Sequence, residues 1–406
     1  MSEIHLETAL SLPSGFLFGE VPSVTEPVAA EPVAGAAVPE APAAAAAAAA
    51  PSLGPLAAFT GTFRGSGFNL IFRPDSASSP TALPIPVSGS DNVLELNLTL
   101  ETLSFSPGLG SVPNRGSGNQ ADIFLNGVPY LQTISDVTVP SRPIGIHFEP
   151  GLWMAVPATA IPHEGTTIVR MASIPHGATL EAQGASTTIA GKPTIPAVDI
   201  TPFTTGSNPP AKITFPSQTA ASNNTARIPQ NLASFIAAGT ITQAMLNDPN
   251  TLLRNHLAPQ AVTSTSIISI SSAPVAPLIG GGIRNIAFLL GNQTAHPAQP
   301  NAQTLNMQAT FWIETVDYTI EVPIFEPGQP ALTIPAVAGA AGQPVPEFLV
   351  NPPIAITAPR SIVVKATQIQ YSQQVFLNFN GLTWPHVSVA TLVPSSPVSI
   401  PASAWA

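Results

Sequence analysis

Long runs of alternating apolar and polar residues are the feature of this sequence that most restricts its fold. In the run from Val93 to Phe105, leucines at every second position from Leu94 to Leu100 share one face, and polar residues occupy the other. Side chains of a β-strand point alternately to opposite faces, so each such run predicts a strand. About nine or ten runs of this kind, joined by segments rich in Gly and Pro, predict an all-β fold: an antiparallel, meandering β-barrel.

The chain of 406 residues divides into a folded part and several segments that do not alternate. The tract 21–57 is rich in Ala and Pro, which indicates a disordered linker that cannot bury a core. The only helical signal lies between Asn231 and His256: a short helix that Gly239 ends, and then an N-cap followed by Pro at Asp248 and Pro249. We therefore expect a possible docking peptide (1–20), a linker (21–57), a barrel domain (58–394) with a partly helical insertion (185–260) and a second insertion (323–358), and a C-terminal tail (395–406).

Charge and cysteine content exclude several classes of function. The formal net charge is −10 with only 12 basic residues, so nucleic acid is not an expected partner, and no segment predicts membrane insertion. The sequence contains no Cys, which excludes thiolate metal sites and cysteine nucleophiles. The N-terminus lacks the features of a signal peptide, and we expect a cytoplasmic protein.

The last predicted strand, residues 382–393, carries a histidine on an otherwise small-residue face. Alternation places His386, Ser388 and Ala390 on that face. This arrangement is typical of a ligand cavity inside a small barrel, with His386 in the cavity. An ordinary close-packed strand, in which the imidazole bonds to a neighbouring carbonyl, is the alternative.

A second informative strand is predicted around His147 and Glu149. The two residues share one face unless Pro150 interrupts the strand. A histidine beside a carboxylate can act as a proton relay, so both are candidate catalytic residues. They can equally form a buried polar pair that satisfies itself.

The remaining histidines give weaker signals. His163, Glu164 and His176 lie at predicted turns and, together with His147, could form a site with two histidines and a carboxylate, although their spacing matches no standard metal signature. His256 and His296 are expected to face solvent. Aromatic residues including Trp153 and Trp384 could line a pocket for a flat ligand or fill the core.

Three blocks of the sequence, in this order, resemble the nitrobindin-like haem-binding proteins, whose fold is related to the fatty-acid-binding and lipocalin barrels. The first block is Gly-Thr-Phe-Arg-Gly-Ser-Gly, which includes Phe63, Gly65 and Gly67. The second begins at His147 and ends at Trp153, and the third runs from Trp384 through His386 to Leu392. Phe63 stands where the family has Trp, and the Arg that follows the central block in the family is missing.

The resemblance implies a cofactor and a site. It implies haem b with iron bound by His386, the single metal ligand, and a cofactor pocket that includes Trp384, Phe63, Gly65, Gly67 and Trp153. The protein would then act on diatomic ligands or small oxidants, through nitric oxide binding, peroxynitrite isomerisation or a peroxidase-like step.

Two other functions are compatible with the sequence. The first is a haem-free, lipocalin-like barrel that binds a small apolar molecule, which the missing Arg favours. The second is a structural or assembly module, in which the N-terminal peptide binds a protein partner.

Overall fold

The structure is a computed structural model that describes residues 50–75, 80–87, 92–275, 279–286, 289 and 301–405. Within this part the fold is mostly β, as the alternation predicts. The predicted docking peptide (1–20), most of the predicted linker and His296 lie outside the described residues.

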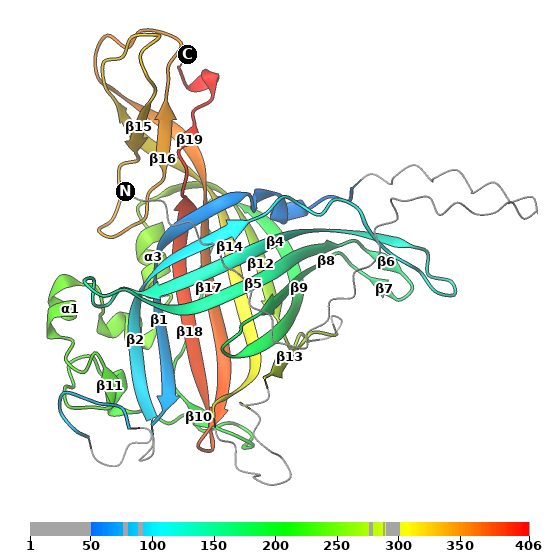
Figure 1. Cartoon of the computed structure of the whole chain (residues 1–406), viewed down its shortest axis with the longest axis vertical. Helices are drawn as coiled ribbons and strands as arrows, with labels where there is room; N and C mark the ends of the chain where they lie inside the picture. The colour runs from blue at the N-terminus through cyan, green and yellow to red at the C-terminus, as the bar shows by residue number, and fades with distance from the viewer. Residues whose placement is uncertain are drawn as a thin grey trace, which may run out of the picture. The chain divides into compact units, whose positions relative to one another are not determined.

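Ten antiparallel strands form a closed barrel (Figure 1). Each pairs with the next barrel strand along the chain, and the first pairs with the last, so the barrel is a meander and the prediction is confirmed. The ten strands are β1 (Gly61–Pro74), β2 (Asn92–Phe105), β4 (Ile123–Asp136), β5 (Ile144–Val156), β8 (Thr167–Ser173), β9 (Ala178–Ala190), β12 (Ala261–Ser271), β14 (Gln303–Val322), β17 (Arg360–Phe379) and β18 (Leu382–Pro394).

Two glycines of β1 permit close packing at the seam where β1 meets β18. A Cβ atom on Gly65 would lie 1.9 Å from the carbonyl oxygen of Thr391, and one on Gly67 would lie 2.3 Å from that of Val389. Neither position has room for a side chain, so the glycines permit this close approach of the two strands where the barrel closes.

An apolar core closes one end of the barrel, here called the closed-end core. The 3₁₀ helix η1 (Gly54–Ala58) and Phe59 cover this end, and the Phe59 ring stacks on Phe105 with centroids 4.5 Å apart. Phe63 and Trp153 are buried in this core, 3% and 1% exposed. This end of the barrel interior is therefore filled with side chains.

The insertion between β9 and β12 packs on the outer wall of the barrel. It contains β10 (Phe203–Thr204), η2 (Pro216–Gln218), β11 (Arg227–Ile228), α1 (Ala233–Ala238), α2 (Gln243–Asn247) and α3 (Thr251–Leu257). Its apolar residues form one buried cluster with outward-facing side chains of β1, β2 and β18, including Leu94 and Val389. The outer face of these strands is thus buried as well as the inner face.

The insertion is held by buried polar groups as well. The guanidinium of Arg227 donates to six backbone carbonyls, those of Ser217, Thr219, Ala220, Ser222, Pro229 and Gln230. His256 of α3 is 4% exposed, and its Nδ1 lies 3.0 Å from Oγ1 of Thr391 on β18. The expectation that His256 faces solvent is therefore wrong, because α3 packs this side chain against the barrel wall.

A smaller apolar core, the extension core, lies beyond the barrel, on the C-terminal part of β14 and the N-terminal part of β17 (Figure 1). β15 (Leu332–Pro335), β16 (Glu347–Val350) and β19 (Val398–Ser399) form a three-stranded sheet there, and η3 (Ala402–Trp405) follows. Trp405 is buried in this core at 4% exposure. The predicted insertion at 323–358 and the predicted C-terminal tail thus both contribute to the extension core.

Four short strands complete the fold: β3 (Val112–Asn114), β6 (Thr159–Ala160), β7 (His163–Glu164) and β13 (Gly282–Asn285). β13 pairs with β9 beyond the end of β12. No helix in the described residues has the length and apolarity needed to cross a membrane.

Candidate functional site

A cavity of about 490 Å³ occupies the part of the barrel interior that the closed-end core leaves open. Its walls are mainly aliphatic, with Ile71, Ile134 and Leu377 among them. Polar side chains from several strands also border it, namely Asn69, Glu95, Asn97, Gln132, His147, His176, Asn301, Thr304, Tyr371, Gln373, His386 and Ser388. A mostly apolar cavity with a few convergent polar groups has the character of a small-molecule site.

His386 lines this cavity from β18, on the face that alternation predicts. Its Nε2 lies 2.9 Å from Nδ2 of Asn69 on β1, and the same Nδ2 donates to Oγ of Ser388 at 2.7 Å. Burial lowers the pKa of His386 to about 4, with further lowering from the nearby His147 and His176. At neutral pH the imidazole is therefore uncharged.

The predicted pair of His147 and Glu149 is present on β5. Nε2 of His147 lies 3.1 Å from Oε2 of Glu149, whose side chain is fully buried. The other carboxylate oxygen accepts from Nη2 of Arg170 on β8 and from the Tyr130 hydroxyl on β4. Burial alone would raise the pKa of Glu149, but Arg170, His147 and Tyr130 together lower it to about 2.

Arg170 is held from all sides inside the barrel. Its Nε donates to the Tyr130 hydroxyl at 2.8 Å, and its Nη1 donates to Oε1 of Gln373 at 2.7 Å. The guanidinium carbon also lies 5.6 Å from the centre of the Trp153 ring, within cation–π range. Each of the three guanidinium nitrogens of Arg170 therefore has a hydrogen-bond partner inside the barrel.

A second buried carboxylate lies beside this ion pair. Oε2 of Glu101 accepts from the Tyr371 hydroxyl at 2.6 Å and from Gln132 at 3.4 Å, while Oε1 accepts from Thr99 at 2.9 Å. Burial raises the pKa of Glu101 to about 6, against the lowering effect of these hydrogen bonds. Burial also raises the pKa of Tyr371 well above its ordinary value, so its hydroxyl remains a donor.

These groups form a polar layer across the barrel interior, consisting of Thr99, Glu101, Tyr130, Gln132, Glu149, Arg170, Tyr371 and Gln373. Gln132, Tyr371 and Gln373 border the cavity, while Tyr130 and Tyr371 also pack in the closed-end core. The layer therefore lies between the core and the cavity and forms the polar floor of the cavity.

The predicted metal site with two histidines and a carboxylate is only partly assembled. The rings of His147 and His176 meet edge to face, with centroids 5.3 Å apart. His163 and Glu164 lie instead on the small hairpin of β6 and β7. Among the described residues, no group of three or more His, Asp or Glu side chains is placed to hold a metal ion.

Among the residues predicted to bind a cofactor, only His386 lines the cavity. Phe63 and Trp153 belong to the closed-end core, and Gly65 and Gly67 lie at the β1–β18 seam. Trp384 packs in the cluster beneath the insertion, where its Nε1 donates to the carbonyl oxygen of Phe379 at 3.0 Å. The structure thus places these five residues away from His386 and the cavity.

Several residues of the site were missed by the sequence analysis: Asn69, Glu101, Tyr130, Gln132, Arg170, Tyr371 and Gln373. The two-residue period carries a signal for some of them, because Glu101 lies on the polar face of the run from Val93 to Phe105. Arg170 is the single charged residue of strand β8, and its neighbours from Ile168 to Ala172 are apolar, which is itself a sign that it has a buried partner.

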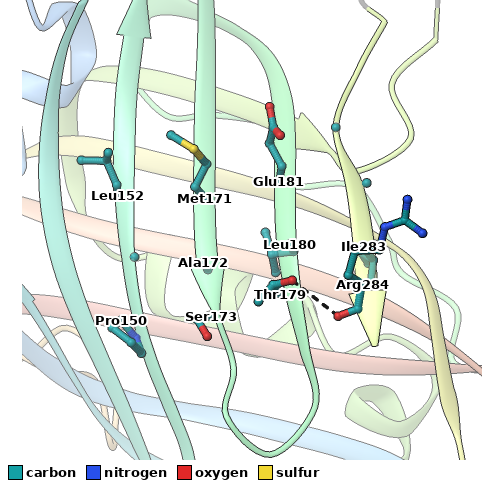
Figure 2. Close-up of a pocket in the computed structure, with 13 residues that line it drawn as sticks. Pro150, Leu152, Met171, Ala172, Ser173, Thr179, Leu180, Glu181, Ile283 and Arg284 are labelled. Carbon is teal, nitrogen blue, oxygen red and sulfur yellow. Dashed lines mark hydrogen bonds between the residues drawn. The ribbon is translucent and has the colours of Figure 1, made fainter. Parts of the chain in front are cut away.

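A second, larger concavity of about 600 Å³ lies along β5, β8, β9 and β13 (Figure 2). Leu152, Met171 and Glu181 are neighbours across three paired strands in it. Its described lining contains no cluster of buried polar groups comparable to the polar layer. The cavity inside the barrel is therefore the stronger candidate site.

Comparisons of this chain with protein-family models, with curated proteins and with solved structures give no match.

Proposed function

We propose that this protein binds a small amphipathic molecule in the cavity of the barrel. The observation that carries the proposal is the cavity itself, about 490 Å³ of space with aliphatic walls above a buried polar floor. A cavity of this size is within the range of drug-sized ligands. The rigid hydrogen-bonded floor favours recognition of one end of the ligand, and the apolar walls favour burial of the rest.

The test uses binding of the neutral, polarity-sensitive dye prodan and a substitution that fills the cavity. Val375 of β17 lines the cavity, whereas the adjacent Phe376 does not and contacts Phe203 of the insertion. We expect Val375→Trp to weaken dye binding at least tenfold and Phe376→Trp to leave it nearly unchanged. Equal affinity in the parent protein and in Val375→Trp would contradict the proposal. Native mass spectrometry of the purified protein would identify a copurified ligand.

Haem binding is the second candidate. Its support is His386, a neutral imidazole that borders the cavity together with His147 and His176. Nε2 of His386 accepts a hydrogen bond from Asn69, so iron could bind this nitrogen only after the amide turns away. The residues present therefore fit haem less well than an uncharged organic ligand, and we derive no reaction through it.

Titration with hemin separates the two candidates. If His386 binds iron, the parent protein gains a Soret band that His386→Ala weakens and His176→Ala preserves. Absence of a Soret change in the parent protein would exclude this candidate and would leave the small-molecule proposal intact.

A further inference from the structure

The hydrogen bond with Glu149 shows that Nε2 of His147 carries a proton. The pKa of Glu149 near 2 keeps its carboxylate ionised at neutral pH, so it only accepts hydrogen bonds. The Nε2 of His147, 3.1 Å away, must therefore donate. The other ring nitrogen of His147, Nδ1, forms no hydrogen bond with any described residue.

His386 has the opposite arrangement. The Nδ2 group of Asn69 has two protons and donates to both Nε2 of His386 and Oγ of Ser388. Nε2 of His386 is therefore the acceptor of this bond, and the proton of the neutral ring is on Nδ1. No described residue accepts a hydrogen bond from this Nδ1. Two ring nitrogens of cavity-lining histidines, Nδ1 of His147 and Nδ1 of His386, are thus without a partner among the described residues.

The charge balance of the barrel interior is negative. The polar layer contains one guanidinium, Arg170, which is already paired with Glu149. It also contains Glu101, whose pKa of about 6 leaves it mostly ionised at neutral pH. At the cavity rim, Arg73 is paired with Glu95 at 2.5 Å. Because Arg170 and Arg73 are each already paired with a carboxylate, neither is free to bind an anionic ligand, and Glu101 would repel such a ligand.

We infer that the ligand is an uncharged, hydroxyl-bearing apolar molecule, and not a carboxylate such as a fatty acid. Its hydroxyl groups would hydrogen-bond to Nδ1 of His147 and accept from the Nδ1–H of His386, while its apolar body would lie against the aliphatic walls. A hydroxyl both donates and accepts, so it can hydrogen-bond to either of these ring nitrogens. This inference rests on the proposed small-molecule function and adds the chemical class of the ligand.

Three matched probes test the class of ligand by displacing prodan near pH 7.5: 2-naphthol, 2-methoxynaphthalene and 2-naphthoate. They share one apolar body and differ in the polar group. We expect 2-naphthol to displace the dye at a concentration at least tenfold below that of 2-naphthoate and several-fold below that of the methyl ether. An equal or better effect of 2-naphthoate would overturn the inference, and so would an equal effect of the ether.

Charge variants test the reason for this preference. Glu101→Gln removes the unpaired carboxylate without altering the pair of Glu149 and Arg170. It should strengthen 2-naphthoate binding about tenfold relative to 2-naphthol binding. Glu181→Gln, on the outer face, is the matched control and should change neither. An unchanged affinity of Glu101→Gln for 2-naphthoate would refute the charge argument. If prodan itself does not bind the parent protein, the proposed function fails instead, so the two failures are distinguishable.

Discussion

Removing Arg170 should leave Glu149 as an unpaired charge in the centre of the barrel. In the parent protein the pKa of Glu149 falls from its ordinary 4.5 to about 2, which corresponds to about 3 kcal/mol of stability at neutral pH. Because the folded-state pKa is lowered, this contribution is present above pH 4.5 and is lost as the pH falls toward 2. It depends mainly on Arg170, the strongest of the groups that oppose the effect of burial.

In Arg170→Met the sign of the pH dependence should reverse. Burial then raises the pKa of Glu149 above its ordinary value, so the ionised carboxylate destabilises the fold at neutral pH. We expect a loss of about 3–5 kcal/mol at pH 7, the usual cost of breaking a buried ion pair, and a smaller loss near pH 5. Urea denaturation followed by tryptophan fluorescence at several pH values measures both effects.

Arg227→Met is the matched control, because Arg227 is equally buried but donates only to backbone carbonyls. It should destabilise the protein without the recovery at low pH. The double variant Glu149→Gln/Arg170→Met should lose clearly less stability than the sum of the two single variants. Additive losses, or a loss in Arg170→Met that is independent of pH, would refute the assignment of the ion pair.

Two further predictions concern the buried carboxyl group of Glu314 on β14 and the close contact of Gly184 on β9 with the neighbouring strand. Burial raises the pKa of Glu314 from 4.5 to about 8, so stability should fall as the pH rises from about 4.5 to 8, where the unfolded chain ionises this carboxyl and the folded chain keeps it protonated. Glu314→Gln should remove a few kcal/mol of this loss, measured by denaturation between about pH 4.5 and pH 8. Gly184→Ala should lower the free energy of unfolding by about 1–3 kcal/mol, because its Cβ would lie 1.8 Å from the carbonyl oxygen of Ser269. The control Gly177→Ala should cost little, because the nearest atom to its Cβ would be 3.6 Å away. Equal melting temperatures of the two variants would contradict this prediction.

The alternation predicted the strands well but could not tell which of their faces lies inside the barrel. Glu101 faces the interior, while Leu94 and Leu96 lie outside beneath the insertion. A two-residue period defines two faces, and burial normally identifies the apolar one as the inner face. Here the insertion buries the outer face, and a polar layer crosses the interior, so the usual assignment fails.

The candidate site was predictable only where its residues are close in sequence. His147 and Glu149 are two residues apart on one strand, and their contact is present as alternation predicts. The contact of Glu149 with Arg170 depends on the register of β5 against β8, and a shift of one residue would turn Arg170 to the outside. Similarly, Asp248 and Pro249 predicted a helix start, but the burial of His256 depends on packing between distant parts of the chain.

The barrel can close only when β1, its first strand, pairs with β18, its last strand. Gly65 pairs with Leu392, and Asn69 meets His386 across 317 positions of the chain. Domains dominated by such distant pairings fold slowly, because the chain must close a long loop before the contacts form. On the ribosome, nine barrel strands would emerge before the tenth can complete the wall. A nascent chain therefore has two open sheet edges until β18 appears.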